Sequence, residues 1–161
     1  MTIKPGDKIP SATLKHMTAD GPAEITSDDL FSGKKVVVFG LPGAFTPTCS
    51  AKHVPGFVQQ ADAIKGKGVA TIACLSVNDA FVMGAWGKDQ KVGNKVLMLA
   101  DGSADFTRKL GLELDLNALG MGTRCKRFAM IVDDGVVKHL AIEEAPGGLD
   151  VSSAEKTLAA L

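Results

Sequence analysis

The chain of 161 residues is long enough to bury one hydrophobic core, and we predict a single domain over residues 1–161. Its 18 basic and 18 acidic residues cancel, so composition offers no electrostatic attraction for nucleic acid or for an anionic membrane. No apolar run approaches the length of a membrane span, and three cysteines in neither CxxC nor zinc-ribbon spacing argue against a secreted disulfide framework.

The first half of the chain is predicted to alternate strands with helices. A short strand within residues 11–18 and a capped helical turn at Ser27–Phe31 precede the apolar run Lys35–Gly40, which predicts a buried parallel strand. A helix follows this strand. Because proline lacks an N–H and clashes with the preceding turn, residues 54–56 predict a kink, with the helix resuming over residues 57–64.

The middle of the chain continues this alternation. Residues 69–77 form a second predicted strand, and Asn78-Asp79 caps a helix over residues 80–88. A third strand at residues 96–100 and a short helix at 104–110 follow. Residues 112–123 have little periodicity and contain two glycines, so we predict a loop there.

The last part of the chain predicts a hairpin and one helix. An Asp-Gly pair between the apolar runs 127–132 and 136–143 is a strong hairpin signal. Ser152 with Glu155 fits a capping box that opens a helix to Leu161. Strands that alternate with helices before a closing hairpin indicate an α/β sandwich with a mixed central sheet flanked by helices.

The junction after the strand Lys35–Gly40 predicts a reactive cysteine. Thr46 suits a side-chain N-cap and Pro47 the first helical position, so Cys49 falls in the first turn beside N–H groups that have no intrahelical partner. The positive end of the helix dipole there favours a thiolate. The alternative is a buried, inert cysteine that packs like a small apolar side chain.

The same stretch resembles a known family. The run Pro42-Gly-Ala-Phe-Thr-Pro-Thr-Cys-Ser-x-x-His-Val-Pro-Gly-Phe57 is similar to the active-site region of peroxiredoxins, in particular their type II branch with the peroxiredoxin-five group. The resemblance implies a thioredoxin-like three-layer sandwich and an antioxidant thiol-dependent peroxidase that reduces hydrogen peroxide and alkyl hydroperoxides through a Cys49 sulfenic acid. It also implies a homodimer, no cofactor or metal, and regeneration by glutaredoxin with glutathione or by thioredoxin.

The reaction dictates which groups must surround the sulfur. A thiolate that attacks a peroxide spreads negative charge over sulfur and both oxygens, so the site needs fixed donors. Thr46 offers a hydroxyl and a backbone N–H, and Pro42 shields the sulfur without adding a competing donor. By resemblance, Cys49 is the peroxidatic cysteine and Thr46 and Pro42 are its partners.

An always-charged donor is still required, and arginine suits it because its fork of donors is rigid. The family places a catalytic arginine at the start of a strand near the hairpin, and Arg127 matches that context best. Arg124 is the alternative candidate. It is also open that both are solvated charges at the end of a strand.

His53 lies four residues after Cys49, and a helix would bring the two to neighbouring positions. It is a candidate base for the thiol, whereas a metal site is incomplete because no second ligand pair accompanies the two residues. Type II sequences commonly carry a histidine here without a principal catalytic role. We therefore expect His53 to contact the catalytic groups and hold them in place, without taking part in the reaction itself.

The other cysteines decide how the sulfenic acid is resolved. Cys74 lies 25 residues after Cys49, as the second cysteine of plant-type members does, which makes it a candidate resolving thiol. It also lies in an apolar strand, so the alternative is a core residue. A direct disulfide needs the two Cα atoms within about 7 Å, which requires unwinding of the Cys49 turn. Cys125 has basic neighbours that predict a lowered pKa, but it matches no family role.

Three aromatic side chains are candidates for either a dimer surface or the core. Phe45 and Phe81 resemble positions that type II enzymes use for a dimer surface, although core packing is an equal alternative for them and for Trp86.

The first residues lack the apolar core of a signal peptide, and the thiols are expected to be reduced, so we expect a cytoplasmic protein. A CxxC-type disulfide oxidoreductase or a non-catalytic binding protein would fit the Pro42, Thr46, Cys49 and Arg127 set poorly.

Overall fold

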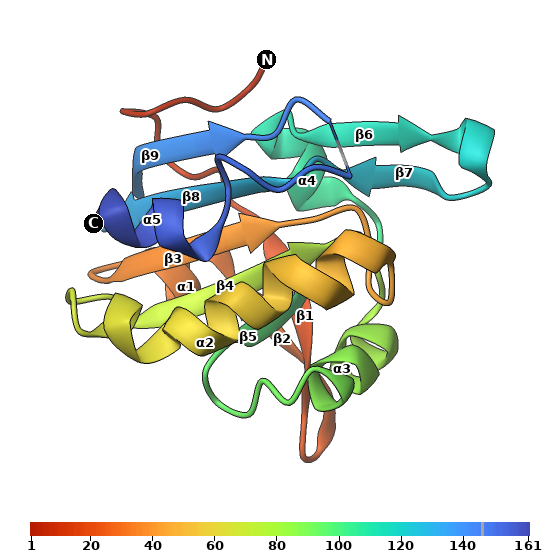
Figure 1. Cartoon of the computed structure of the whole chain (residues 1–161), viewed down its shortest axis with the longest axis horizontal. Helices are drawn as coiled ribbons and strands as arrows, with labels where there is room; N and C mark the ends of the chain where they lie inside the picture. Colours follow the sequence, from red (N-terminus) through yellow and green to blue (C-terminus); the bar gives the residue numbers. More distant parts are fainter. Residues whose placement is uncertain (146) are drawn as a thin grey trace.

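Within residues 1–145 and 147–161, which the computed structural model describes, the chain forms a seven-stranded mixed sheet in the order β2-β1-β5-β4-β3-β8-β9 (Figure 1). Its strands are β1 (Thr13–Thr18), β2 (Gly21–Thr26), β3 (Lys35–Gly40), β4 (Thr71–Ser76), β5 (Leu97–Ala100), β8 (Phe128–Asp133) and β9 (Val136–Ile142). Strands β3, β4 and β5 are parallel, and the other neighbours pair antiparallel. The predicted α/β architecture with a mixed sheet is therefore confirmed, as are six of these strands.

Both faces of the central strands are buried, which explains why β3 and β4 have continuous apolar sequences. Successive side chains of a strand point to opposite faces. On one face, Val37, Phe39 and Cys74 pack with α2 (Val54–Lys65) and α3 (Ala80–Asp89). The opposite face of the same strands packs with α1 (Ser27–Phe31) and α4 (Asp105–Leu110). Two apolar clusters thus join three layers.

The prediction of a loop over residues 112–123 is wrong. Strands β6 (Glu113–Leu116) and β7 (Gly122–Cys125) form an antiparallel hairpin through the short 3₁₀ helix η2 (Asn117–Leu119), and it extends beyond the main sheet in Figure 1. The alternation Glu-Leu-Asp-Leu in β6 places half-buried leucines on one side. This period of two is the strand signal that the glycines concealed. The edge strand β2 was also missed because Pro22 weakens its strand pattern, and an edge is where a sheet tolerates proline.

The kink predicted at residues 54–56 is wrong in its position. A π-helical turn, η1 (Cys49–His53), leads directly into α2, and the Val54 N–H donates to the Cys49 carbonyl across this wider turn. Pro55 consequently falls in the first turn of α2, where a missing N–H is tolerated. The irregularity lies one turn earlier than expected, at the cysteine itself, and isolated π turns are frequent at functional sites.

The last helix begins one residue later than predicted. In α5 (Ala154–Ala159) the Ser153 hydroxyl accepts from the Lys156 N–H at 3.2 Å, so the capping residue is Ser153 rather than Ser152. Ser152 is thereby left for other contacts. No helix in residues 1–145 or 147–161 combines the length and the apolar character that crossing a membrane requires.

Candidate active site

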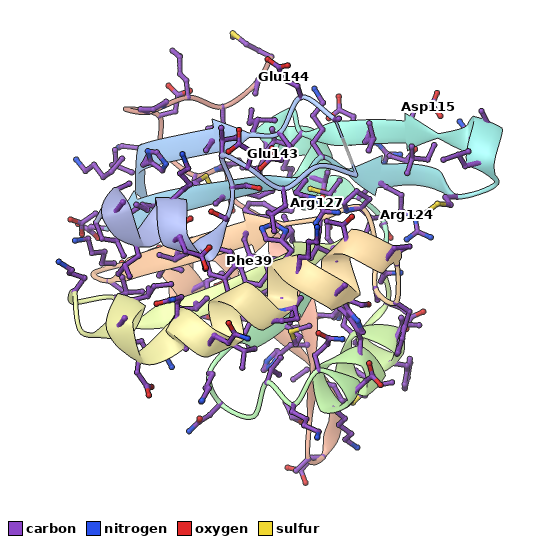
Figure 2. All side chains as sticks on the ribbon, viewed as in Figure 1. Phe39, Asp115, Arg124, Arg127, Glu143 and Glu144 are labelled. Carbon is purple, nitrogen blue, oxygen red and sulfur yellow. The ribbon has the colours of Figure 1, made fainter. Side chains whose placement is uncertain are left out.

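Cys49 and Arg127 meet at the carboxyl end of β3. Gly40 ends this strand and pairs with Phe128, so the loop after Gly40 and the residue before Phe128 reach the same edge of the sheet. Gly40 is required there, since a Cβ would overlap the ring of Phe128. Figure 2 shows Arg127 between the central strands and the helix that follows Cys49. Ligand sites in α/β sheets are common at such an edge.

Arg127 makes a polar contact with the sulfur. Its Nη2 donates to the Cys49 Sγ at 3.1 Å, and Arg127 is only 2% exposed while Cys49 is fully buried. Charge interactions are stronger in such a dry environment than in water. A guanidinium at this distance stabilises negative charge on the sulfur. The alternative that Arg127 is a solvated strand-end charge is wrong.

His53 holds the other arm of the guanidinium. Its Nδ1 lies 2.9 Å from Arg127 Nη1, and its Nε2 lies 3.0 Å from the Ser152 carbonyl oxygen. Because a guanidinium only donates and a carbonyl only accepts, Nδ1 is the acceptor and Nε2 carries the proton. Burial, and then the positive charge of Arg127, lower the pKa of His53 to about 3. The ring is neutral at physiological pH, and with Nδ1 engaged by Arg127 it orients the arginine instead of acting as a base for the thiol.

The loop before Cys49 is fixed by its own hydrogen bonds. The Thr46 carbonyl accepts from the Ser50 N–H at 3.0 Å, as an N-cap carbonyl does, but the Thr46 hydroxyl donates to the Gly43 carbonyl at 2.7 Å. The side-chain cap predicted for Thr46 is therefore wrong. The hydroxyl proton is used within the loop, which leaves the oxygen lone pairs for a ligand.

Arg124 supports the same loop from the β6–β7 hairpin. Its Nη1 donates to the Pro42 carbonyl at 3.2 Å, and its Nε donates to the Met121 carbonyl at 3.0 Å. Gly43 makes room for this side chain, because a Cβ there would lie 2.6 Å from Nη1. Arg124 is thus partly buried and holds the Pro42 carbonyl in place. The alternative that Arg124 is a solvated charge at the end of a strand is therefore also wrong.

Comparisons with known proteins agree with the geometry of this site. The Redoxin family model matches residues 4–158. The chain belongs to the peroxiredoxin family. It is 50% identical to Peroxiredoxin-2E, chloroplastic, of Arabidopsis thaliana over 164 residues, covering 99% of this chain and 70% of that protein. It is 49% identical to Peroxiredoxin-2B of the same plant, covering 99% of this chain and 98% of that protein.

A solved structure agrees with these sequence relatives. Reduced Prx3 from Vibrio vulnificus, determined in complex with H₂O₂, is 52% identical, has a TM-score of 0.93 and covers 99% of both chains. The expected type II peroxiredoxin family, thioredoxin-like fold and enzyme class are thereby confirmed. The protein is a thiol-dependent peroxidase.

Several residues of this peroxiredoxin that fix the site were missed in the sequence. The Asn78 side-chain oxygen accepts from the Ala44 N–H at 3.0 Å and from the Ser76 hydroxyl at 2.6 Å, which anchors the loop before Cys49. Asn78-Asp79 was interpreted as a cap, and only Asp79 caps α3, by accepting from the Val82 N–H. Trp86 Nε1 donates to the hydroxyl of Ser50 at 3.0 Å, a contact with no signal in the sequence.

The other two thiols of the peroxiredoxin lie in its core. Cys74 is fully buried beside Phe39 on the α2 face of the sheet, and Cys125 is fully buried in the cluster on the opposite face. Burial raises the pKa of both thiols well above the ordinary value for cysteine. The pKa lowering predicted for Cys125 is therefore wrong. Its Sγ donates to the Lys126 carbonyl, and all three cysteines are free thiols.

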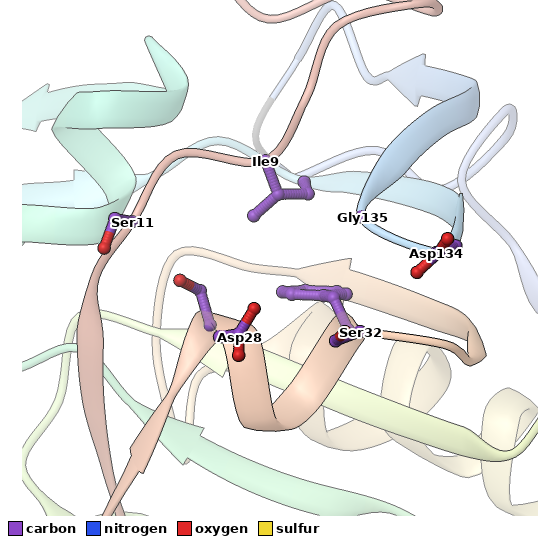
Figure 3. A pocket seen from close by; sticks show the side chains of 8 residues that line it. Ile9, Ser11, Asp28, Ser32, Asp134 and Gly135 are labelled. Atoms are coloured by element: carbon purple, nitrogen blue, oxygen red, sulfur yellow. The ribbon is translucent and has the colours of Figure 1, made fainter.

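A pocket of about 210 Å³ lies at the other end of β3, between α1 and the β8–β9 turn (Figure 3). Among its lining residues are Ile9, Asp28, Phe31 and Asp134, and the lining that the structure describes brings no thiol, imidazole or guanidinium to a ligand. In the described part of the chain, no three His, Cys, Asp or Glu side chains gather closely enough to hold a metal ion. The groups suited to peroxide chemistry are those around Cys49.

Proposed function

We propose that Cys49 is the nucleophile that cleaves the O–O bond of a peroxide. The observation that carries this proposal is the 3.1 Å contact from Arg127 Nη2 to the Cys49 Sγ in a buried setting. The thiolate attacks one oxygen, and a sulfur–oxygen bond forms as the O–O bond breaks. The other oxygen leaves as hydroxide or alkoxide and takes up a proton, and Cys49 becomes a sulfenic acid.

The neighbouring residues have separate roles in this proposal. Arg127 stabilises the negative charge that develops on sulfur and oxygen. Thr46, whose proton is committed to Gly43, accepts a hydrogen bond from the hydroxyl of the peroxide. Pro42 carries no N–H and shields the sulfur from water. Hydrogen peroxide as a substrate is supported by the H₂O₂ complex of the V. vulnificus relative, and we extend the proposal to alkyl hydroperoxides.

An external thiol completes the proposed cycle. A thiol of glutathione, glutaredoxin or thioredoxin attacks the sulfenic acid and releases water, and a second thiol then frees Cys49 from the mixed disulfide. Cys74 is a poor internal resolver in this conformation, since its thiol is fully buried and burial raises its pKa. These reductants and three free thiols suit the cytoplasm, which is where we propose that the enzyme acts.

The intact mass of the reduced protein after one equivalent of hydrogen peroxide tests this proposal. With free thiols blocked under denaturing conditions, we expect one added oxygen on Cys49 and blocked thiols at Cys74 and Cys125. A disulfide between Cys49 and Cys74 would instead identify Cys74 as the resolving thiol and contradict the one-cysteine cycle. An unchanged mass would reject Cys49 as the nucleophile.

We further propose a homodimer in which Phe45 and Phe81 lie at the interface. These side chains are 56% and 67% exposed, and the Phe45 ring lies 6.3 Å from that of buried Trp86. The core-packing alternative is therefore wrong for Phe45 and Phe81 and right for Trp86. The left-handed backbone of Phe45, with φ of 61°, is uncommon for an aromatic residue. Exposed aromatic groups of this kind are typical of interface centres.

The substitution Phe81→Glu is expected to convert the dimer to a monomer, because a carboxylate would be desolvated at the interface. Sedimentation velocity measures the change. Leu119→Glu is the matched control, since Leu119 is 71% exposed on η2 in the β6–β7 hairpin and should leave the dimer intact. Dimers of Phe81→Glu with the affinity of the wild type would contradict this interface.

A further inference from the structure

One carboxylate outside the proposed catalytic groups gathers three donors. Glu143 directly follows β9, and its Oε2 accepts from the Asp150 N–H at 2.9 Å, the Ser152 N–H at 2.8 Å and the Ser152 hydroxyl at 2.6 Å. The Glu143 N–H in turn donates to the Arg127 carbonyl at 2.9 Å. Figure 2 shows Glu143 close to Arg127. Glu143 therefore joins the chain at Ser152 to Arg127, the residue directly before β8.

A continuous series of hydrogen bonds runs from this carboxylate to the sulfur. Glu143 holds both the N–H and the hydroxyl of Ser152, and the Ser152 carbonyl accepts from His53 Nε2. His53 Nδ1 then accepts from Arg127 Nη1, and Arg127 Nη2 reaches the Cys49 sulfur. Because the guanidinium is planar and rigid, an acceptor that fixes Nη1 also fixes the direction of Nη2.

The segment that Glu143 holds is tied to the Cys49 helix at a second point. The Thr48 hydroxyl donates to the Gly147 carbonyl at 2.9 Å, immediately before Cys49. Partial burial opposes ionisation of Glu143, but the hydrogen bonds from Ser152 and Asp150 outweigh it and hold the pKa of this carboxyl below its usual value. The group is thus an anion at neutral pH, and hydrogen bonds to an anion are stronger than those to a neutral acceptor.

We infer that Glu143 is a positioning residue for peroxide reduction, which acts through Ser152 and His53 to aim the Arg127 guanidinium at the Cys49 sulfur. The inference rests on the proposed roles of Cys49 and Arg127. Glu143 touches neither the sulfur nor the peroxide. Without its carboxylate the Ser152 carbonyl loses its anchor, the His53 ring is free to reorient, and the donor on the sulfur is displaced. Displacements of about 1 Å cost up to about 100-fold in rate.

The test compares Glu143→Ala and Glu143→Gln with Glu144→Ala. Glu144 is the adjacent, exposed residue, so its substitution makes the same change in charge and serves as the matched control. The second-order rate constant for hydrogen peroxide is measured per titratable Cys49 thiol in the reduced, full-length enzyme. We expect a fall of about 10-fold for Glu143→Ala, a smaller fall for Glu143→Gln, which keeps one acceptor oxygen, and the wild-type value for Glu144→Ala.

The ¹⁵N chemical shifts of the His53 ring distinguish a positioning role of Glu143 from an effect on the stability of the fold alone. In the wild type they should report a proton on Nε2 and a bare Nδ1, and in folded Glu143→Ala an average of tautomers. A lower melting temperature with an unchanged rate constant and unchanged His53 shifts would overturn the inference. Where Glu143→Ala does not fold, Glu143→Gln decides by the same two measurements: a lower rate with altered shifts supports the inference, and wild-type values of both reject it.

Failure of the inference is distinct from failure of the proposed function. Peroxidase activity retained in Cys49→Ser would reject Cys49 as the nucleophile, and the role of Glu143 with it. Activity lost in Cys49→Ser but a wild-type rate constant in Glu143→Ala would overturn only the role of Glu143.

Discussion

Replacement of Cys49 by serine is expected to reduce peroxidase activity to background. A serine hydroxyl is not ionised at neutral pH, and it cannot be oxidised to a sulfenic acid, so both the nucleophile and the intermediate are lost. Arg127 would still lie beside residue 49, which makes the variant close to the wild type in shape. Peroxide consumption with a small dithiol as reductant measures the effect, and the melting temperature confirms that the variant is folded.

The other thiols provide matched controls for this substitution. Cys74→Ser and Cys125→Ser make the same chemical change at fully buried positions and cost about 1–3 kcal/mol of stability, because a hydroxyl is buried in an apolar site. With an external thiol as reductant, both variants should keep the activity of the wild type per folded molecule. Activity retained by Cys49→Ser, or an equal loss in folded Cys125→Ser, would contradict the assignment of the nucleophile.

The sequence predicts those parts of the fold whose signal is local. Strands β3 and β4 are apolar along their length because both faces of the sheet are covered, and their burial produces the pattern that identifies them. Strand β6 has only one half-buried face, and the glycines at and before the start of β7 resemble those of a loop. The π turn at Cys49–His53 has no residue signature, since the same side chains would also form a regular helix.

In the site, too, the sequence predicts what is local and misses contacts between residues that are distant in the chain. Pro42, Thr46 and Cys49 lie within one short stretch of the chain, so a single sequence motif identifies all three. The contacts that aim Arg127 join residues far apart, with His53 and Ser152 separated by 99 positions and His53 and Arg127 by 74. A single sequence carries no record of such pairings. The spacing of four residues from Cys49 left a base for the thiol open as an alternative role for His53, and the fold makes the ring a neutral acceptor for the arginine instead.

Arg127→Lys and Arg127→Gln are both expected to lower the rate constant for hydrogen peroxide by about 100- to 1000-fold, the range found when a fixed donor to developing charge is removed. Lysine should not rescue the loss. The two arms of Arg127 engage His53 Nδ1 and the Cys49 sulfur at the same time, and one ammonium group cannot reproduce that rigid fork. Stopped-flow fluorescence measures the rate, because the single tryptophan, Trp86, is hydrogen-bonded to Ser50 beside Cys49.

Arg124→Lys and Arg124→Gln are the matched controls for the second arginine of the segment. Arg124 donates to the Pro42 carbonyl rather than to the sulfur, so its variants should loosen the loop and lower the rate less than those of Arg127. Removal of Arg127 also leaves the buried His53 Nδ1 without this donor, at about 1–3 kcal/mol, so rates are compared per folded molecule. An equal loss in both pairs would mean that loop position, and not the charge on the sulfur, limits the reaction. A wild-type rate in Arg127→Gln would remove the arginine from the mechanism, because no other part of the proposal compensates for the missing positive charge.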